Sequence, residues 1–210
     1  MICFEDWERI DYQAAWVQQK ELVEKRIQNQ IADTLIFCEH NPVVTLGRAS
    51  QRNAEVFPTC PYPVVEIERG GQATYHGPGQ IVLYPIFGLA KKSGLPGRQG
   101  VLDLIRSLEK LIIEYLKSQS LKAEAIEGKT GVWVGEGARK IASIGIAVRH
   151  WVSYHGLALN FATGQKPWQA INPCGFEASV MTDLERELNR KFTYYELVRD
   201  LKEQAKKVFS

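Results

Sequence analysis

Cys174 is the residue of this 210-residue chain best suited by its surroundings to be a nucleophile. It stands in the segment INPCG, where a proline before it and a glycine after it favour a tight turn. A cysteine reacts as its thiolate, and a nearby cation favours that form. A buried, inert thiol is the alternative interpretation. The other three cysteines lack such a setting, and Cys38, in the apolar segment LIFC, is expected in the core.

Lys140 is a candidate for the nearby cation. It precedes the apolar segment IASIGIAV, and on a strand its side chain would share one face with Ala142, Ile144 and Ile146. A lysine at the head of an inward face can be a buried ammonium group, which pairs with a thiolate or acts as a base. The alternative is a solvated lysine at the start of a strand.

A glycine-rich segment, RGGQATYHGPGQ at positions 69–80, supplies Arg69, Thr74, His76 and many backbone N–H groups. It lacks the Lys-Ser/Thr pair of a phosphate loop, and the GKT at 128–130 has alanine at position 123, where that motif needs glycine. No GxGxxG, HExxH or GxSxG pattern occurs, so we expect neither a nucleotide nor a metal site. A cysteine nucleophile, a lysine and a glycine-rich cradle together indicate acyl transfer.

Composition bounds the remaining possibilities. The net charge of +2 gives no reason to expect nucleic acid, and no apolar run approaches the 18 residues of a membrane span. Acidic residues at positions 5, 6 and 8 argue against a secretory signal. Four scattered cysteines without a CxxC pair fit a reducing cytoplasm. The length and the absence of linkers predict a single domain over residues 1–210.

Hydrophobic periodicity predicts the elements that must position these groups. A helix capped by Asp11 is expected to run to about Ile31, a second helix should span 101–119, and Thr193 should cap a third. In the second helix a stripe from Leu102 to Leu116 is expected to be buried, with Glu109 on the polar side. Strands are expected over 34–40, 43–47, 62–68, 81–89, 121–127, 131–136, 139–152 and 154–162. Because the strands cluster, we predict an α/β (α+β) fold with a mixed, largely antiparallel sheet flanked by helices.

The chain resembles the octanoyltransferases, also called lipoate–protein ligase B. Three separated blocks in family order carry the resemblance, and they span about residues 40–185. They contain RGG, TYH, GQ and YP from the glycine-rich region, then KIA with IG, and finally HGLALN with PCG. One departure is TDL at 182–184, where relatives often have TSL.

The resemblance implies a fold like the catalytic domain of biotin and lipoate protein ligases, and it implies roles for individual residues. Cys174 would carry an octanoyl group as a thioester, and Lys140 would lower the pKa of its thiol. The residues that would line the acyl pocket are Arg69, Gly70, Gly71, Gln72, Ala73, Thr74, Tyr75, His76, Ser143, Ile144, Gly145, Gly156, Leu157 and Ala158. Whether His76 contacts the substrate or only shapes the segment stays open.

The implied reaction moves an octanoyl group from acyl carrier protein to a lysine of a lipoyl domain, in 2-oxoacid dehydrogenases or the glycine cleavage H protein. It needs no cofactor or metal, and we expect a cytoplasmic monomer that binds neither nucleic acid nor membrane. Lys91, Lys92 and Arg98 are candidates for a basic rim that meets acidic partners. The alternatives are an ATP-dependent lipoate or biotin ligase, a thioester hydrolase with the same Cys–Lys pair, and a non-catalytic protein that binds acyl carriers or lipoyl domains.

Overall fold

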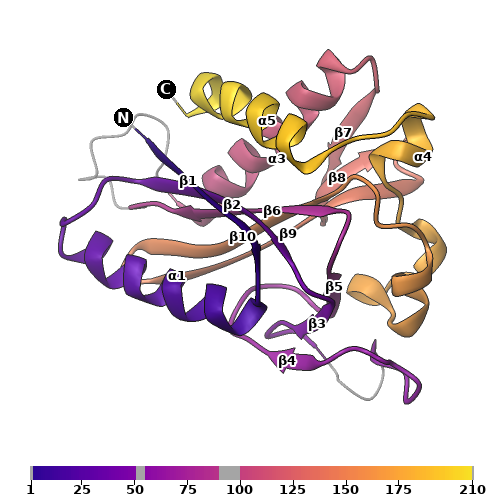
Figure 1. Ribbon diagram of the computed structural model, residues 1–210, viewed down its shortest axis with the longest axis horizontal. Helices are drawn as coiled ribbons and strands as arrows, with labels where there is room; N and C mark the ends of the chain where they lie inside the picture. Colours follow the sequence, from indigo (N-terminus) through magenta and orange to yellow (C-terminus); the bar gives the residue numbers. More distant parts are fainter. Residues whose placement is uncertain (1, 51–54, 90–99, 210) are drawn as a thin grey trace.

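Seven strands form the larger sheet, in the order β1-β2-β6-β10-β9-β8-β7 (Figure 1). The structure, a computed structural model, describes residues 2–50, 55–89 and 100–209. The strands are β1 Cys3–Ile10, β2 Thr34–His40, β6 Gln80–Ile86, β7 Ala123–Ile126, β8 Lys129–Val134, β9 Arg139–Arg149 and β10 Val152–Asn160. Only β1 and β2 pair in parallel within this sheet. The predicted mixed, largely antiparallel sheet is therefore confirmed.

A smaller sheet holds the glycine-rich segment against the larger one. Its order is β4-β3-β5, with β3 Val43–Leu46, β4 Val64–Glu66 and β5 Thr74–His76. The sequence prediction left 69–80 without a strand and is wrong there, because β5 lies inside this segment and β6 begins at Gln80. Pairing with β3 fixes the backbone at residues 74–76, so the irregular part is shorter than expected.

Helices cover both faces of the larger sheet (Figure 1). They are α1 Tyr12–Ile27, α3 Val101–Ser118, α4 Leu184–Leu188 and α5 Tyr194–Val208, and the 3-10 helices η2 Lys166–Ala170, η3 Pro173–Gly175 and η4 Ala178–Val180 precede α4. Side chains of β2 alternate between two cores: Leu35 and Phe37 pack with α3 and α5, whereas Ile36 and Cys38 pack with α1. This period of two explains why every residue of β2 is buried.

The N-terminal region departs from the sequence prediction. The first element is a strand, β1, which the sequence prediction did not include. Half of the residues of CFEDWERI are charged, and the strand pairs only at the edge of the sheet. Asp11 caps α1 as predicted, through its carboxylate and the N–H groups of residues 13 and 14. The helix ends at Ile27 instead of about Ile31.

Two positions of α3 are the reverse of the prediction. Leu102 lies in the first turn and is 75% exposed, whereas Glu109 is 1% exposed. The Glu109 carboxylate accepts a hydrogen bond from the Gly131 N–H (3.2 Å) and pairs with Arg106. These partners compensate the burial of its charge, which periodicity alone does not reveal.

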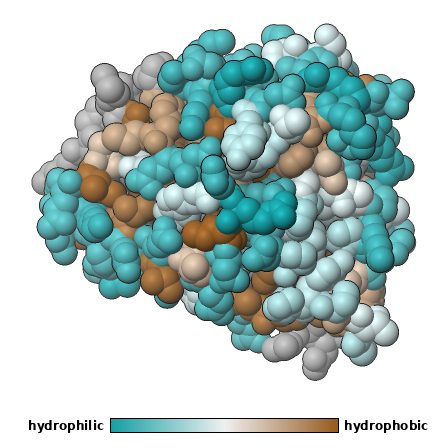
Figure 2. Space-filling model, viewed as in Figure 1, coloured by the Kyte–Doolittle hydropathy of each residue, from teal (hydrophilic) through white to brown (hydrophobic). Residues whose placement is uncertain are grey.

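On the face drawn in Figure 2, hydrophobic side chains form small patches separated by hydrophilic ones. None of the helices in the described ranges is long and apolar enough to cross a membrane. Among these same residues, no group of three or more histidine, cysteine, aspartate or glutamate side chains could hold a metal ion. The predicted basic rim, with Lys91, Lys92 and Arg98, lies outside the described residues.

Candidate active site

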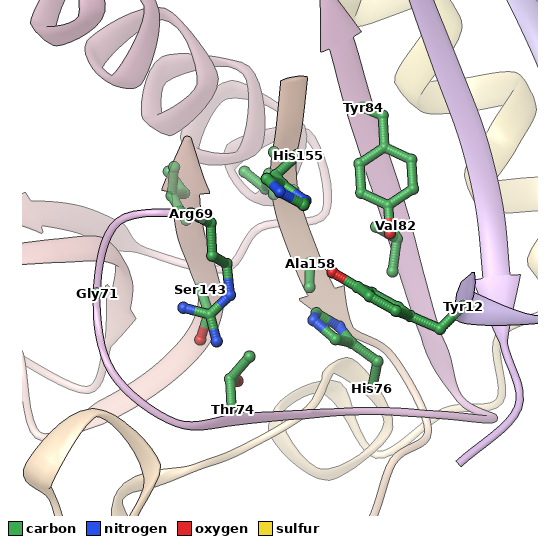
Figure 3. Close-up of a pocket in the computed structure, with 14 residues that line it drawn as sticks. Tyr12, Arg69, Gly71, Thr74, His76, Val82, Tyr84, Ser143, His155 and Ala158 are labelled. Atoms are coloured by element: carbon green, nitrogen blue, oxygen red, sulfur yellow. The ribbon is translucent and has the colours of Figure 1, made fainter. Parts of the chain in front are cut away.

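A pocket lies between the larger sheet and the glycine-rich segment (Figure 3). Its volume is about 450 Å³ when the open space at its mouth is included. The glycine-rich segment lines it with Arg69, Gly71, Thr74 and His76. Strands β9 and β10 line it with Ser143, Ile144, Gly145, Gly156, Leu157 and Ala158. These predicted pocket residues, distant in sequence, are thus brought together.

Four other predicted residues do not line this pocket. The N–H of Gly70 donates to the Ile146 carbonyl (3.0 Å), and the N–H of Ala73 donates to a buried carboxylate. Tyr75 packs between the rings of Tyr62 and Trp168. Gln72 lies with its amide close to the α-carbon of Gly175. The expectation of many free N–H groups in the segment is therefore wrong for Gly70 and Ala73.

Four lining residues were not among the predicted pocket residues: Tyr12, Val82, Tyr84 and His155. Val82 and Tyr84 alternate on β6, so its period of two could have placed them on one face. His155 opens the segment HGLALN and could have been considered with its neighbour Gly156. Tyr12 directly follows the cap of α1, and nothing in its local sequence indicates a pocket.

The guanidinium of Arg69 holds the segment on the smaller sheet. It is buried and donates to the Thr45 carbonyl (2.8 Å) and to the Gly70 carbonyl (3.0 Å). Gly47 allows the close approach, since a Cβ there would lie 2.3 Å from the Gly71 carbonyl oxygen. The positive charge of Arg69 therefore sits at the pocket wall with its hydrogen bonds directed into the protein.

Two buried carboxylates fix the same segment from behind. Glu55 accepts the Ala73 N–H (2.7 Å), and Glu39 accepts the Gly79 N–H (2.7 Å). Glu39 also forms an ion pair with Arg9 of β1. Hydrogen bonds to charged groups are the stronger kind, so the backbone on both sides of β5 is firmly held.

Two neutral histidines support one side of the pocket. The Nδ1–H of His40 donates to the Ile10 carbonyl (2.9 Å), so its Nε2 accepts from the Tyr84 hydroxyl (2.6 Å). The Nδ1–H of His76 donates to Gln80 Oε1 (2.7 Å), and the ring stacks on Tyr12. Burial lowers the pKa of His40 to about 4 and that of His76 to about 3. Both rings are therefore uncharged at neutral pH.

His76 thus has a structural contact and a place in the pocket wall. Gln80 Nε2 donates to the Tyr75 carbonyl and to Asn160 Oδ1, which leaves its Oε1 as the acceptor for His76. Asn160 in turn donates to the Thr182 carbonyl (3.0 Å). This chain of hydrogen bonds joins the pocket to the segment that follows η4.

His155 lies on β10 in an unusual backbone conformation. Its φ is +55°, a left-handed value that costs a residue with a side chain roughly 1–2 kcal/mol. The side chain of Gln19 on α1 compensates by accepting the His155 N–H (2.8 Å). Burial lowers the pKa of His155 to about 4, with Glu68 acting in the opposite direction.

Lys140 is 3% exposed, so the prediction of an inward-facing lysine on β9 is correct as to its burial. Its Nζ lies 5.4 Å from the centre of the Trp133 ring and 6.0 Å from that of Phe176, distances at which a cation is attracted to a ring. Gly131 makes room for it: a Cβ at Gly131 would lie 2.7 Å from Lys140 Cε. This glycine directly follows the GKT at 128–130 that we rejected as a phosphate loop.

Cys174 belongs to the single turn of η3, which contacts β5 of the glycine-rich segment. Phe176, which follows the turn, is the residue whose ring meets the lysine. The Lys140 carbonyl accepts the N–H of Thr182 (3.0 Å), which anchors the segment after η4 on β9. A Cβ at Gly175 would lie 3.0 Å from Gln72 Oε1. The direct Cys174–Lys140 interaction remains a prediction.

Comparison with known proteins decides the family. The sequence profile described as the lipoyl protein ligase A/B catalytic domain matches residues 11–206. An octanoyltransferase of Bdellovibrio bacteriovorus is 39% identical over 222 residues, covering 99% of this chain and 98% of its own length. The chain belongs to the octanoyltransferases. The predicted acyltransferase class is thereby confirmed.

Solved structures agree on the fold of this octanoyltransferase family member. A bi-partite lipoate protein ligase from Thermoplasma acidophilum has a TM-score of 0.72 at 13% identity, covering 98% of this chain and 82% of that chain. Biotin protein ligase from Aquifex aeolicus has a TM-score of 0.57 at 10% identity, covering 99% and 69%. The predicted likeness to the biotin and lipoate ligase fold is confirmed, and at such identities the likeness concerns the fold alone.

Proposed function

We propose that this octanoyltransferase, as one catalytic domain over residues 1–210, moves an octanoyl group from octanoyl-acyl carrier protein to a lysine of a lipoyl domain. The acceptors are lipoyl domains of 2-oxoacid dehydrogenases and the glycine cleavage H protein. Cys174 carries the acyl group between the two proteins. The relatives named octanoyltransferase support the choice of acyl group, and the pocket between the glycine-rich segment and strands β9 and β10 offers a place for it.

The observation that carries this proposal is the buried Lys140. An ammonium group held over aromatic rings favours an anion nearby, and the ring of Phe176 joins it to the turn with Cys174. Lys140 therefore stabilises the Cys174 thiolate, the form that attacks a thioester. No other cysteine of the sequence stands between a proline and a glycine.

In the first step the Cys174 thiolate attacks the carbonyl carbon of the octanoyl thioester. The bond from that carbon to the carrier sulfur breaks, and the carrier thiolate takes a proton from the Lys140 ammonium. One thioester replaces another, so the step is close to isoenergetic. Lys140 is left as a neutral amine.

In the second step the neutral amine of the acceptor lysine attacks the acyl-enzyme. The carbon–sulfur bond to Cys174 breaks, an amide forms, and the proton lost by the nitrogen passes to Lys140. The thiolate and ammonium are both restored. Because an amide is more stable than a thioester, this step runs downhill and the cycle needs no ATP. The two protein substrates use the same site in turn.

The oxyanion formed in each step needs hydrogen-bond donors. The Gly70 N–H is not available for this purpose, because it already donates to the Ile146 carbonyl. We assign the alkyl chain to the pocket, where Val82, Ile144, Leu157 and Ala158 supply apolar wall. His76 orients β5 and β6 through its hydrogen bond to Gln80, and its ring also forms part of the pocket wall around the alkyl chain.

The test is to mix the protein with octanoyl-acyl carrier protein and measure peptide masses. We expect one octanoyl group on the peptide that holds Cys174, and complete loss of transfer in Cys174→Ala. Cys38→Ala is the matched control, because Cys38 is fully buried in the core and burial raises the pKa of its thiol. A Cys174→Ala protein that still transfers octanoate would refute the mechanism.

Two further substrate experiments distinguish the proposed transferase from the alternative functions. Loading of free octanoate that depends on ATP would favour a ligase. Release of free octanoate from the carrier without any acceptor would favour a hydrolase. A protein that binds the carrier but never gains the acyl mass would be a binding protein.

A further inference from the structure

One end of the pocket is formed by a histidine to which the mechanism gives no role. On β9 and β10, Ser143 pairs with Ala158 and Ile146 pairs with His155. Since a strand rises about 3.3 Å per residue, His155 lies roughly 10 Å from the level of Ser143 and roughly 20 Å from that of Lys140. In Figure 3 His155 and Thr74 lie at opposite ends, with Ala158 between them. His155 is thus distal to the reacting end.

The fold holds His155 firmly in this place. The residue is 1% exposed, and its left-handed backbone is fixed by the hydrogen bond to Gln19, which is itself fully buried. A strained conformation persists only where its surroundings impose it, and such positions cluster at functional sites. The imidazole is therefore a rigid wall rather than a side chain free to swing aside.

The ring of His155 is polar in a pocket whose middle is apolar. Neither ring nitrogen has a hydrogen-bond partner among the residues that the structure describes, and Nε2 lies 3.9 Å from Glu68 Oε2, too far for a direct bond. Both nitrogens are already buried away from water, and a hydrocarbon placed against the ring could offer them no hydrogen bond, which is unfavourable. The preceding part of the wall, at Ile144 and Leu157, has no such cost.

We propose that His155 determines the acyl chain length, because it ends the pocket both as a steric stop and as a polar surface. This inference rests on the proposed octanoyl transfer. Each methylene that reaches only Val82, Ile144 and Leu157 gains from burial, whereas the next one meets the imidazole. The preferred substrate is then a medium-chain acyl thioester whose methyl end stops at His155.

The experiment measures kcat/KM for carriers loaded with six-, eight-, ten- and twelve-carbon chains. Wild type should show a sharp fall at one length beyond octanoyl. In His155→Gly, which suits the left-handed backbone, the decanoyl-to-octanoyl ratio should rise about tenfold or more, since one methylene in a fitted pocket is worth about 10- to 200-fold. His155→Asn, also tolerant of this backbone, should give a smaller rise.

His150→Gly is the matched control. It changes a histidine that also has a positive φ, +45°, in the turn between β9 and β10, but is exposed and outside the pocket. Its ratio should equal that of wild type. An unchanged ratio in His155→Gly and His155→Asn, or a gradual decline with length in wild type, would overturn the inference. A wild-type protein without octanoyl transfer would overturn the proposed function instead.

Discussion

Lys140 and the pocket histidines are all buried bases, yet the protein surrounds them differently. The Lys140 ammonium meets the faces of Trp133 and Phe176, and Gly131 leaves space for its stem. His40 and His76 instead hydrogen-bond as neutral rings. The difference teaches that the protein holds the Lys140 cation near η3 and keeps the rings of His40 and His76 uncharged, and uncharged rings suit a neighbouring alkyl chain better.

Removing the charge of Lys140 should have the largest effect. We expect Lys140→Met to lower the transfer rate by about 100- to 10,000-fold, the usual contribution of a positioned acid or base. The fold should survive, because methionine is flexible, has nearly the volume of lysine and can pack against the rings of Trp133 and Phe176. Alkylation of Cys174 by iodoacetamide should require a higher pH than in wild type, because the thiolate has lost its neighbouring cation.

Lys129→Met is the control for that variant. Lys129 also lies 5.4 Å from the Trp133 ring, but it is exposed. Transfer and alkylation should be unchanged. Equal losses in the two variants would show that the ring contact, not the buried charge near η3, is what matters.

Crowding the space around Lys140 should have the next largest effect. A Cβ at Gly131 would lie 2.4 Å from the Ala142 carbonyl oxygen and close to the Lys140 stem. Gly131→Ala should therefore lose about 1–3 kcal/mol of unfolding free energy and displace the ammonium, which slows transfer. The measurements are urea unfolding and kcat.

Gly128→Ala serves for comparison, because Gly128 also has a positive φ, +77°, but open space around it. Gly128→Ala should therefore also strain the backbone but should cause no steric clash. If the two variants are equally stable and equally active, Gly131 does not serve as clearance for Lys140.

Lowering the pH should destabilise the folded protein through its buried histidines. Burial depresses the pKa of His40, His76 and His155 to about 4, 3 and 4 in the folded protein. The unfolded chain therefore binds protons first, from about pH 6.5 downwards, and folding stability falls between pH 6.5 and 4. Each of these histidines lowers the free energy of unfolding by up to about 1.4 kcal/mol for every pH unit of acidification within this range.

Urea midpoints at pH 7, 6 and 5 check this prediction. A midpoint that stays constant over this range would contradict the neutral rings. His155→Asn should reduce the slope, because one of the three depressed groups is gone.

Tyr84→Phe should have the smallest effect on transfer. The hydroxyl donates to His40 Nε2 (2.6 Å), so its removal leaves a buried acceptor without that donor and costs about 1–3 kcal/mol of stability. The charge near η3 is untouched, and kcat should stay close to wild type. Tyr195→Phe, at an exposed tyrosine, should change neither quantity. A large loss of kcat in Tyr84→Phe would give the uncharged side a chemical role.

Long elements with a strong pattern were predictable from sequence, as α3 and the Thr193 cap of α5 show. Strand β1 was not, because an edge strand buries little and half of its residues are charged. The buried Glu109 was missed for a related reason: its partner, the Gly131 N–H, is distant in sequence. Periodicity reports which side chains are apolar and is silent on partners that compensate a charge.

Within the site, the residue types that carry chemistry were visible in sequence and their supports were not. Lys140 was expected to face inward, and it is buried. Gly131 was predicted only as the start of a strand, since its clearance depends on a side chain of the neighbouring strand. His155 and Gln19 meet across separate elements, and neither sequence neighbourhood indicates the contact.

The carboxylates of Glu39 and Glu55 have a consequence for substrate binding. They hold the backbone around β5 before any substrate arrives. The loss of conformational entropy is therefore incurred during folding rather than on binding. In the proposed mechanism, a pocket prepared in this way would keep its shape through both half-reactions, so the wall that receives the acyl group from one protein would also present it to the next.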